Sequence, residues 1–160
     1  MNRRLPLALA VAVLTLAARP AHADVTAFLG ATTTPSTRGA RGLAAGIALL
    51  AIGFEFEYSD TSEDLVKGLP SLRTGMGNVY VQNPIPISGI QFYGTIGGGF
   101  YRERLGSHQE TRSGSNIGGG AKITLVGPLR LRLDYRVFSL TGSPLHKRPK
   151  RVYAGLTVAF

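Results

Sequence analysis

The chain contains neither cysteine nor tryptophan among its 160 residues, and only 17% of its residues are charged. The absence of cysteine excludes a disulfide scaffold, a thiolate metal site and a cysteine nucleophile. The charged fraction is below the roughly 25% of an average soluble domain. Hydrophobic residues make up 44% of the chain, which is too many for a disordered basic protein. The chain is therefore expected to fold through non-covalent contacts alone.

The basic residues outnumber the acidic ones by 18 to 9, which gives a net charge of +9. Such an excess is typical of nucleic-acid binding, but the N-terminus indicates export. Two arginines precede an apolar stretch, Leu5–Ala18, that is interrupted only by Thr15, and an Ala21-His22-Ala23 cleavage motif follows before Asp24. These three parts in this order predict a secretory signal peptide over residues 1–23. An uncleaved membrane anchor is the alternative, although the stretch is shorter than the roughly 20 residues that a spanning helix needs.

Removal of the leader would leave one domain, residues 24–160, with the net charge lowered from +9 to +6. No later segment offers 18 consecutive apolar residues, so a spanning helix is not expected. Apolar residues instead recur with a period of two, most clearly in segment 129–137, which predicts strands. The expected strands are Val25–Thr33, Gly42–Leu49, Ile52–Tyr58, Arg73–Gln82, Ile87–Leu105, Arg112–Val126, Leu129–Leu140 and Arg151–Phe160.

The connections between these strands alternate in length, as in an up-and-down transmembrane barrel. Long connections are expected at residues 34–41, 59–72, 106–111 and 141–150, and short ones near Leu50, at 83–86 and at 127–128. The run Gly42–Phe54 has no turn residue in its middle, so a buried helix is its alternative. Its glycines and the even strand count that closure requires favour two strands. The predicted fold is an all-β, eight-stranded antiparallel barrel that pairs all its backbone groups in lipid.

Two hairpin registers are also predicted. The glycine triplets at 97–99 and 118–120 lie equally far from position 108.5, which would pair Gly98 with Gly119. The last hairpin would pair Leu131 with Val158. Both registers place apolar residues beside apolar residues on one face of the sheet.

The C-terminal segment 153–160 reads Tyr-Ala-Gly-Leu-Thr-Val-Ala-Phe. With the leader and the alternation, the chain resembles the small outer-membrane β-barrels of the OmpA/OmpX-like type over the whole of residues 24–160. The resemblance implies a location in the outer membrane of a Gram-negative bacterium. It also implies that the barrel-assembly machinery recognises the C-terminal pattern, although an ordinary last strand is the alternative. The implied signal residues are Tyr153, Gly155, Val158 and Phe160.

The polar face of the predicted strands carries charges of both signs. An eight-stranded barrel has room inside for little more than its own side chains, and a buried charge needs a partner. A filled, salt-bridged lumen is expected, with a narrow pore as the alternative. The expected interior charges are Glu55, Glu57, Lys122, Arg130, Arg132, Asp134 and Arg136.

Basic residues also gather in the expected long connections, most densely in the last one. Outward-facing loops of this kind would meet the anionic groups of lipopolysaccharide, although solvated loop tips are an equal alternative. The basic loop comprises His146, Lys147, Arg148, Lys150 and Arg151. The connection 59–72 also contains an acidic cluster, Asp60, Glu63 and Asp64. Its oxygens could bind a divalent cation weakly, and a solvated acidic loop is the alternative.

A lipid-modifying enzyme would need a serine, a histidine and an acid near the outer interface. After leader removal the histidines are His108 and His146, with Ser107, Ser143 and Glu110 near them in sequence. Proximity in sequence does not establish a triad. We therefore expect a non-enzymatic structural or surface-interaction protein without a cofactor, a nucleic-acid partner or an identified small-molecule substrate.

Overall fold

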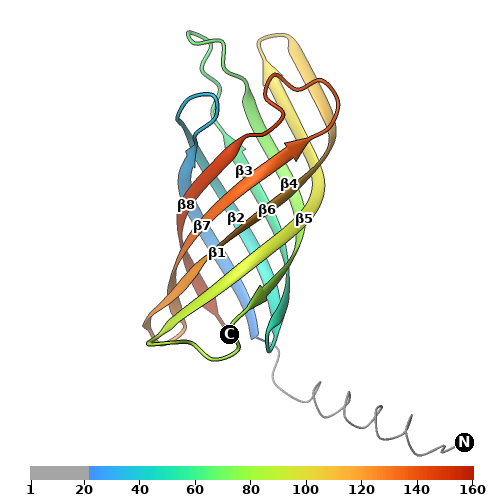
Figure 1. The fold of residues 1–160 in the computed structure, drawn as a ribbon. Coiled ribbons are helices and arrows are strands. Elements are labelled where there is room, and N and C mark those ends of the chain that lie inside the picture. Colours follow the sequence, from blue (N-terminus) through green and yellow to red (C-terminus); the bar gives the residue numbers. More distant parts are fainter. Residues whose placement is uncertain (1–21) are drawn as a thin grey trace, which may run out of the picture.

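The computed structural model describes residues 22–160. Residues 1–21 of the predicted signal peptide, including Ala21 of its cleavage motif, lie outside the described part. The described residues form eight antiparallel strands, each hydrogen-bonded to the next, and the last strand pairs with the first (Figure 1). The strands are β1 (His22–Thr32), β2 (Arg38–Leu49), β3 (Ile52–Thr61), β4 (Ser71–Gln82), β5 (Ile90–Leu105), β6 (His108–Val126), β7 (Leu129–Leu140) and β8 (Lys150–Ala159).

The predicted all-β barrel of eight strands is thus confirmed, including the division of the apolar run 42–54 into two strands. β2 ends at Leu49 and β3 begins at Ile52. The turn places Leu50 at φ 59°, a backbone conformation uncommon for residues other than glycine. A turn without glycine, proline or asparagine gives little local signal. The sequence alone therefore did not exclude a buried helix over residues 42–54.

The register predicted from the glycine triplets is wrong. β5 ends at Leu105 as expected, but β6 begins at His108 and not at Arg112. The turn therefore lies at Gly106 and Ser107, and Gly98 pairs with Ser115 and not with Gly119. The expected long connection at 106–111 is therefore a tight turn, with Gly106 at φ 58°. Leu131 likewise pairs with Leu156 and not with Val158. Both errors are even-numbered shifts, which leave every side chain on its original face and so escape a test based on alternation.

The connections differ at the two ends of the barrel. At the turn end, where β1 begins and β8 ends, strands are joined at residues 50–51, 83–89 and 127–128. At the loop end, the β1–β2, β3–β4 and β7–β8 connections span residues 33–37, 62–70 and 141–149 (Figure 1). Within residues 22–160 the structure has no helix with the length and hydropathy needed to cross a membrane.

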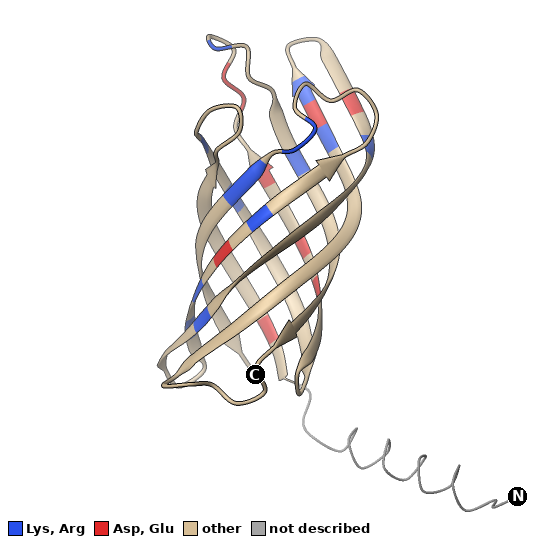
Figure 2. Ribbon diagram, viewed as in Figure 1, with Lys and Arg blue, Asp and Glu red and all other residues tan. Residues whose placement is uncertain are grey.

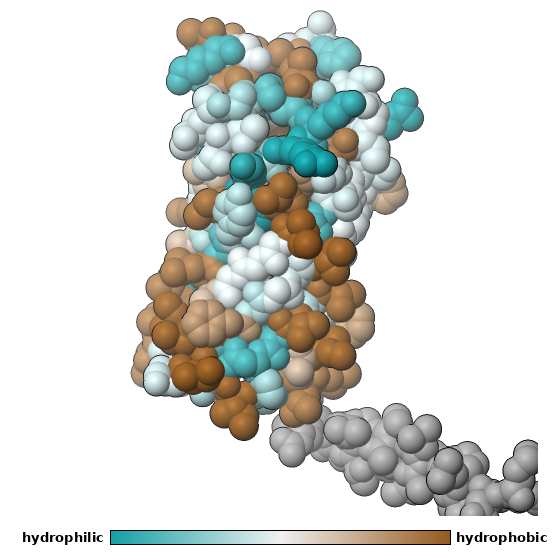
Figure 3. All heavy atoms as spheres, viewed as in Figure 1, coloured by the Kyte–Doolittle hydropathy of each residue, from teal (hydrophilic) through white to brown (hydrophobic). Residues whose placement is uncertain are grey.

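Side chains alternate between the lumen and the outer face along the strands, except in the first residues of β6, which are exposed on both faces. In β3, Ile52, Phe54 and Phe56 are exposed on the outside, whereas Glu55 and Glu57 are buried inside. Apolar residues gather on the lower part of the visible outer face, and polar ones gather nearer the loop end (Figure 3). This distribution of polar and apolar side chains is the reverse of that in a water-soluble barrel with an apolar lumen.

Candidate functional site

The middle of the lumen is occupied by a compact ionic network. Glu55 from β3 lies between two arginines from β7. The Arg132 guanidinium donates two hydrogen bonds to the Glu55 carboxylate, one of them at 3.2 Å. Arg136 donates to Glu55 from Nη2 at 2.8 Å and to Asp134 from Nε at 3.0 Å. One carboxylate from β3 therefore fixes two guanidinium groups across the barrel.

A second branch of the network extends toward the loop end. Arg136 Nη1 lies 3.0 Å from Glu57 Oε2. Arg151 from β8 donates to the other oxygen of the Glu57 carboxylate and to the Ser59 hydroxyl. Arg151 does not belong to the basic loop in which the sequence placed it, because its side chain is buried in the lumen. Val152 faces outward, so the alternation of β8 directs Arg151 inward.

The network is balanced in charge, because three guanidinium groups face three carboxylates. Arg132, Arg136 and Arg151 lie among Glu55, Glu57 and Asp134, and all six side chains are nearly inaccessible to solvent. Burial of a charge is tolerated when it is paired and hydrogen-bonded. The six groups therefore fill and neutralise the middle of the barrel. Figure 2 shows strand segments carrying both signs of charge along its length.

Tyr93 from β5 joins this network from the side. Its hydroxyl donates to Asp134 and accepts a hydrogen bond from Arg132 Nε at 2.7 Å. Gly120 on β6 makes room for both the β7 backbone and the ring, because a Cβ atom at this position would lie 2.0 Å from the Leu133 carbonyl oxygen and 2.6 Å from the Tyr93 hydroxyl oxygen. The glycine triplet thus permits close packing of the lumen, although it does not set the register of its hairpin.

A separate pair lies nearer the turn end of the lumen. Lys122 Nζ lies 2.5 Å from Asp24 Oδ2, and both side chains are buried. Sequence reasoning placed Asp24 only after the cleavage motif and missed its role as the partner of Lys122. Arg130 lies nearby at intermediate burial and its Nη1 is 3.4 Å from the Gln91 side-chain oxygen. These groups line a polar pocket of about 300 Å³ at the turn end.

The loop end of the lumen holds a cluster of buried apolar side chains, and the charged side chains of Arg38 and Glu103 are also buried at this end. Leucine, methionine and aromatic residues from three strands pack into one buried cluster. The cluster comprises Leu72, Met76, Tyr101, Phe138 and Leu140. From the turn end to the loop end, the lumen therefore contains a polar pocket, a neutral ionic network and an apolar plug.

The residues of the predicted assembly signal divide between the two faces of β8. Tyr153 is buried and stacks on Phe28 of β1, with ring centroids 4.0 Å apart. Gly155 also faces inward, where a Cβ atom would lie 2.9 Å from the Phe28 Cβ. Val158 and Phe160 are exposed on the outer face. The backbones of Phe160 and Ala23 exchange two hydrogen bonds of 2.9 Å, which complete the ring between β8 and β1.

The remaining basic-loop residues lie at the loop end. The side chains of Lys147, Arg148 and Lys150 are exposed, and that of His146 is half-buried. Among the described residues, no hydrogen bond joins the His108 or His146 side chain to Ser107, Ser143 or Glu110. Glu110 accepts a hydrogen bond from the Ser143 backbone at 3.0 Å and lies 3.7 Å from Arg112. His146 Nδ1 is buried without a hydrogen-bond partner.

The acidic cluster considered for a cation is dispersed among basic and backbone groups. Asp60 pairs with Arg73, and Glu63 lies 3.6 Å from Arg104. Asp64 accepts a hydrogen bond from the Lys67 backbone at 3.1 Å. Within residues 22–160, no group of three or more histidine or acidic side chains is placed to hold a metal ion.

Comparison with solved structures identifies this architecture. Neisserial surface protein A superposes with a TM-score of 0.70 at 15% identity, over 88% of this chain and 97% of that one. The chain has the fold of the small eight-stranded outer-membrane β-barrels. The N-terminal barrel domain of Pseudomonas aeruginosa OprF superposes on this barrel with a TM-score of 0.64 at 15% identity, over 87% and 97% of the two chains.

The same fold also occurs in an enzyme. The outer membrane enzyme PagL superposes on the barrel with a TM-score of 0.54 at 12% identity, over 84% of this chain and 98% of that one. No protein-family model and no curated protein matches the sequence. At these identities the likeness establishes the fold, and the activity has to be argued from the side chains of this barrel.

Proposed function

We propose that this chain is an integral, non-enzymatic protein of the bacterial outer membrane, with a closed lumen and a basic, solvent-facing loop end. The observation that carries the proposal is the division of side chains between the two faces. The outer face of the barrel wall is mainly apolar, whereas the charged residues in the middle of the lumen are paired with one another. An apolar outer face is favourable against lipid and unfavourable against water, and the closed ring leaves no unpaired strand edge within the bilayer.

The contents of the lumen favour a structural barrel over a pore. The ionic network contains equal numbers of guanidinium and carboxylate groups. The apolar cluster of Met76, Tyr101 and Phe138 lies on its loop-end side. An ion crossing the barrel would have to displace both. The alternative, a narrow pore, would require the buried arginines and carboxylates to separate, at the cost of leaving charges unpaired in a dry interior.

The exposed loops support a role in surface interaction. Short turns face the periplasm and long loops face outward in barrels of this kind, so Lys147, Arg148 and Lys150 would lie outside the cell. Their positive charge is complementary to lipopolysaccharide, which we propose as the anionic partner of the loop end. During insertion, the barrel-assembly machinery would bind the C-terminal strand, and deletion of Phe160 should reduce the assembled fraction.

Membrane fractionation tests the location. The full chain, expressed in a Gram-negative bacterium, should be recovered in the outer-membrane fraction and should migrate faster in SDS gels before boiling than after. A chain that stays soluble in the periplasm would overturn the proposal. Processing of the leader is read from the same sample, because cleavage after Ala23 gives an N-terminus at Asp24.

The second candidate function, a lipid-modifying enzyme, is favoured only by the occurrence of the fold in PagL. Two single variants, His108→Ala and His146→Ala, test it. Expression of the wild-type chain and of either variant should leave the same set of membrane lipids as an empty vector. A lipid product that depends on the wild-type chain and disappears in one variant would establish the enzyme instead.

A further inference from the structure

One row of charged side chains lies on the outer face of the barrel, where the lumen network cannot reach it. Arg41 on β2 is directly opposite Asp60 on β3, which is opposite Arg73 on β4. The row continues to Arg102 on β5. Asp60 lies 3.0 Å from Arg73 and 3.8 Å from Arg41. One carboxylate therefore orients two guanidinium groups and leaves the row with a positive charge.

These guanidinium groups keep donors free for another ligand. The Arg41 side chain is 77% exposed and the Arg73 side chain is 56% exposed. Guanidinium groups bind phosphate through paired hydrogen bonds of fixed geometry. The row thus differs from the buried network, in which every guanidinium is paired with at least one buried carboxylate.

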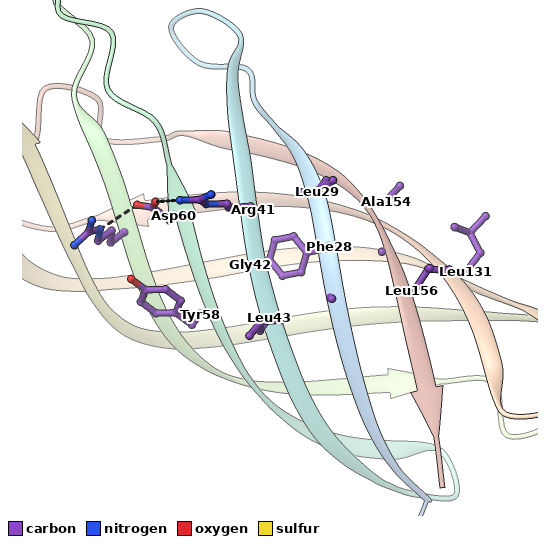
Figure 4. Close-up of a pocket in the computed structure, with 13 residues that line it drawn as sticks. Phe28, Leu29, Arg41, Gly42, Leu43, Tyr58, Asp60, Leu131, Ala154 and Leu156 are labelled. Atoms are coloured by element: carbon purple, nitrogen blue, oxygen red, sulfur yellow. Dashed lines mark hydrogen bonds and ion pairs between the residues drawn. The ribbon is translucent and has the colours of Figure 1, made fainter.

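Directly below this row, toward the turn end, the outer wall has an apolar groove of about 970 Å³ (Figure 4). Its floor is low because small residues, Ala27 on β1 and Ala154 on β8, face outward there. Larger side chains, Leu43 and Leu156 among them, border the groove. Arg41, Asp60 and Arg73 form its upper rim. A hydrocarbon chain in the groove would therefore end beside the guanidinium groups.

The row lies at the loop-end edge of a short outward apolar surface. The outward apolar run on β3, from Ile52 to Tyr58, covers only about 15 Å of the membrane normal at a rise of about 3.3 Å per residue and a tilt of about 40°. A typical apolar band is about 25 Å tall. Arg41 and Arg73 follow directly after this short run, close to the hydrocarbon, where an unpaired cation is costly. A lipid phosphate would neutralise them.

We propose that this groove and its arginine rim form a binding site for the lipid A part of lipopolysaccharide. A phosphate is held by Arg41 and Arg73, and an acyl chain lies over Ala27 and Ala154. The site rests on the proposed outer-membrane location, because only then does the loop end face the leaflet that contains this lipid. Asp60 acts as a positioning residue that holds both guanidinium groups toward the phosphate.

The test is lipid retention by the purified, refolded barrel of residues 24–160, measured by native mass spectrometry. Three probes are compared: diphosphorylated lipid A, the same lipid A after removal of its phosphates, and phosphatidylglycerol. The double variant Arg41→Gln, Arg73→Gln should lower retention of diphosphorylated lipid A about tenfold or more. It should leave the dephosphorylated lipid A unchanged. The matched control Arg104→Gln, Arg112→Gln loses the same charge away from the groove and should retain the wild-type affinity.

The acyl part of the site is tested by filling the groove. Ala154→Phe should lower retention of both forms of lipid A, whereas Ala121→Phe, on the outer face of β6, should not. Equal losses in the two arginine double variants would reduce the effect to net charge and overturn the site. Stronger retention of phosphatidylglycerol than of lipid A, or a dimer that only Ala154→Phe disrupts, would assign the groove to another occupant. Unboiled gel migration of each variant shows that the barrel is folded, so a failed site is distinguished from a failed barrel.

Discussion

Arginine serves two different purposes on the two faces of this barrel. In the lumen, Arg132 and Arg136 are buried next to carboxylates that neutralise their charge. On the outer wall, Arg41 and Arg73 share one carboxylate and remain largely exposed. Much of the basic excess of the sequence is therefore either neutralised in the lumen or placed outside it. The charge available for binding lies on the outer wall and in the loops.

The largest loss of stability is expected when the buried carboxylate of Glu55 is removed. Glu55→Gln would leave Arg132 and Arg136 without their shared carboxylate inside the lumen. Removal of one member of a buried ionic group costs about 3–5 kcal/mol. Urea unfolding of the barrel in lipid vesicles measures this loss. The control is Asp64→Asn in the β3–β4 loop, which should cost less than about 1 kcal/mol. Similar losses for both variants would show that the lumen charges are hydrated and weakly coupled.

The next largest loss of stability is expected when a charge is introduced on the outer face of β7. Leu133 faces outward between two inward-facing charged residues, Arg132 and Asp134. Leu133→Arg should destabilise the barrel by about 2–4 kcal/mol, because it places a cation against the hydrocarbon. Ser139→Arg, outward on the same strand near the loop end, should have little effect. The same unfolding assay measures both, and unchanged stability of the Leu133→Arg variant would contradict the lipid-facing assignment of this wall.

The packing of the lumen is tested at Gly120. A Cβ atom at this position would lie 2.0 Å from the Leu133 carbonyl oxygen of β7 and 2.6 Å from the Tyr93 hydroxyl oxygen. Gly120→Ala should therefore cost about 1–3 kcal/mol, as expected for overpacking. Gly94 on β5 faces open space, because a Cβ atom there would have no neighbour within 4 Å, so Gly94→Ala should leave the unfolding midpoint nearly unchanged. Equal effects would point to backbone flexibility as the reason for both glycines.

The smallest effect is expected for the surface pair between Arg104 and Glu63, 3.6 Å apart at the loop end. Arg104→Gln should change the free energy of unfolding by less than about 1 kcal/mol, because exposed ion pairs are screened by water and salt. The difference between this variant and wild type should disappear at high salt, about 1 M. A loss as large as that of Glu55→Gln would remove the distinction between lumen and surface.

Much of the fold could be predicted because the two faces of each strand meet different surroundings. In β7, the alternation from Leu129 to Val137 identifies both the strand and its inward charges. Register could not be predicted in the same way, since a shift of two or four residues keeps each side chain on its face. The pairing of Gly98 with Ser115 therefore leaves no sign in the pattern.

The functional residues also fall into two groups: those whose position follows from their own strand and those whose position depends on strand pairing. The inward direction of Arg132 follows from its own strand, whereas Arg151 was obscured by the basic residues that precede it. The outer groove could not be predicted, because Ala27 and Ala154 come together only when β1 pairs with β8. The row from Arg41 to Arg73 likewise depends on two registers that no local signal in the sequence defines.

Conductance of the purified wild-type barrel in a planar lipid bilayer tests the central claim most directly, namely that paired charges close the lumen. We predict no stable, discrete conductance above the bare bilayer at physiological salt, because the ionic network and the apolar plug both obstruct the path. Insertion is verified on the same sample by its faster migration before boiling. A reproducible open level in the inserted wild-type protein would contradict the account and establish the pore.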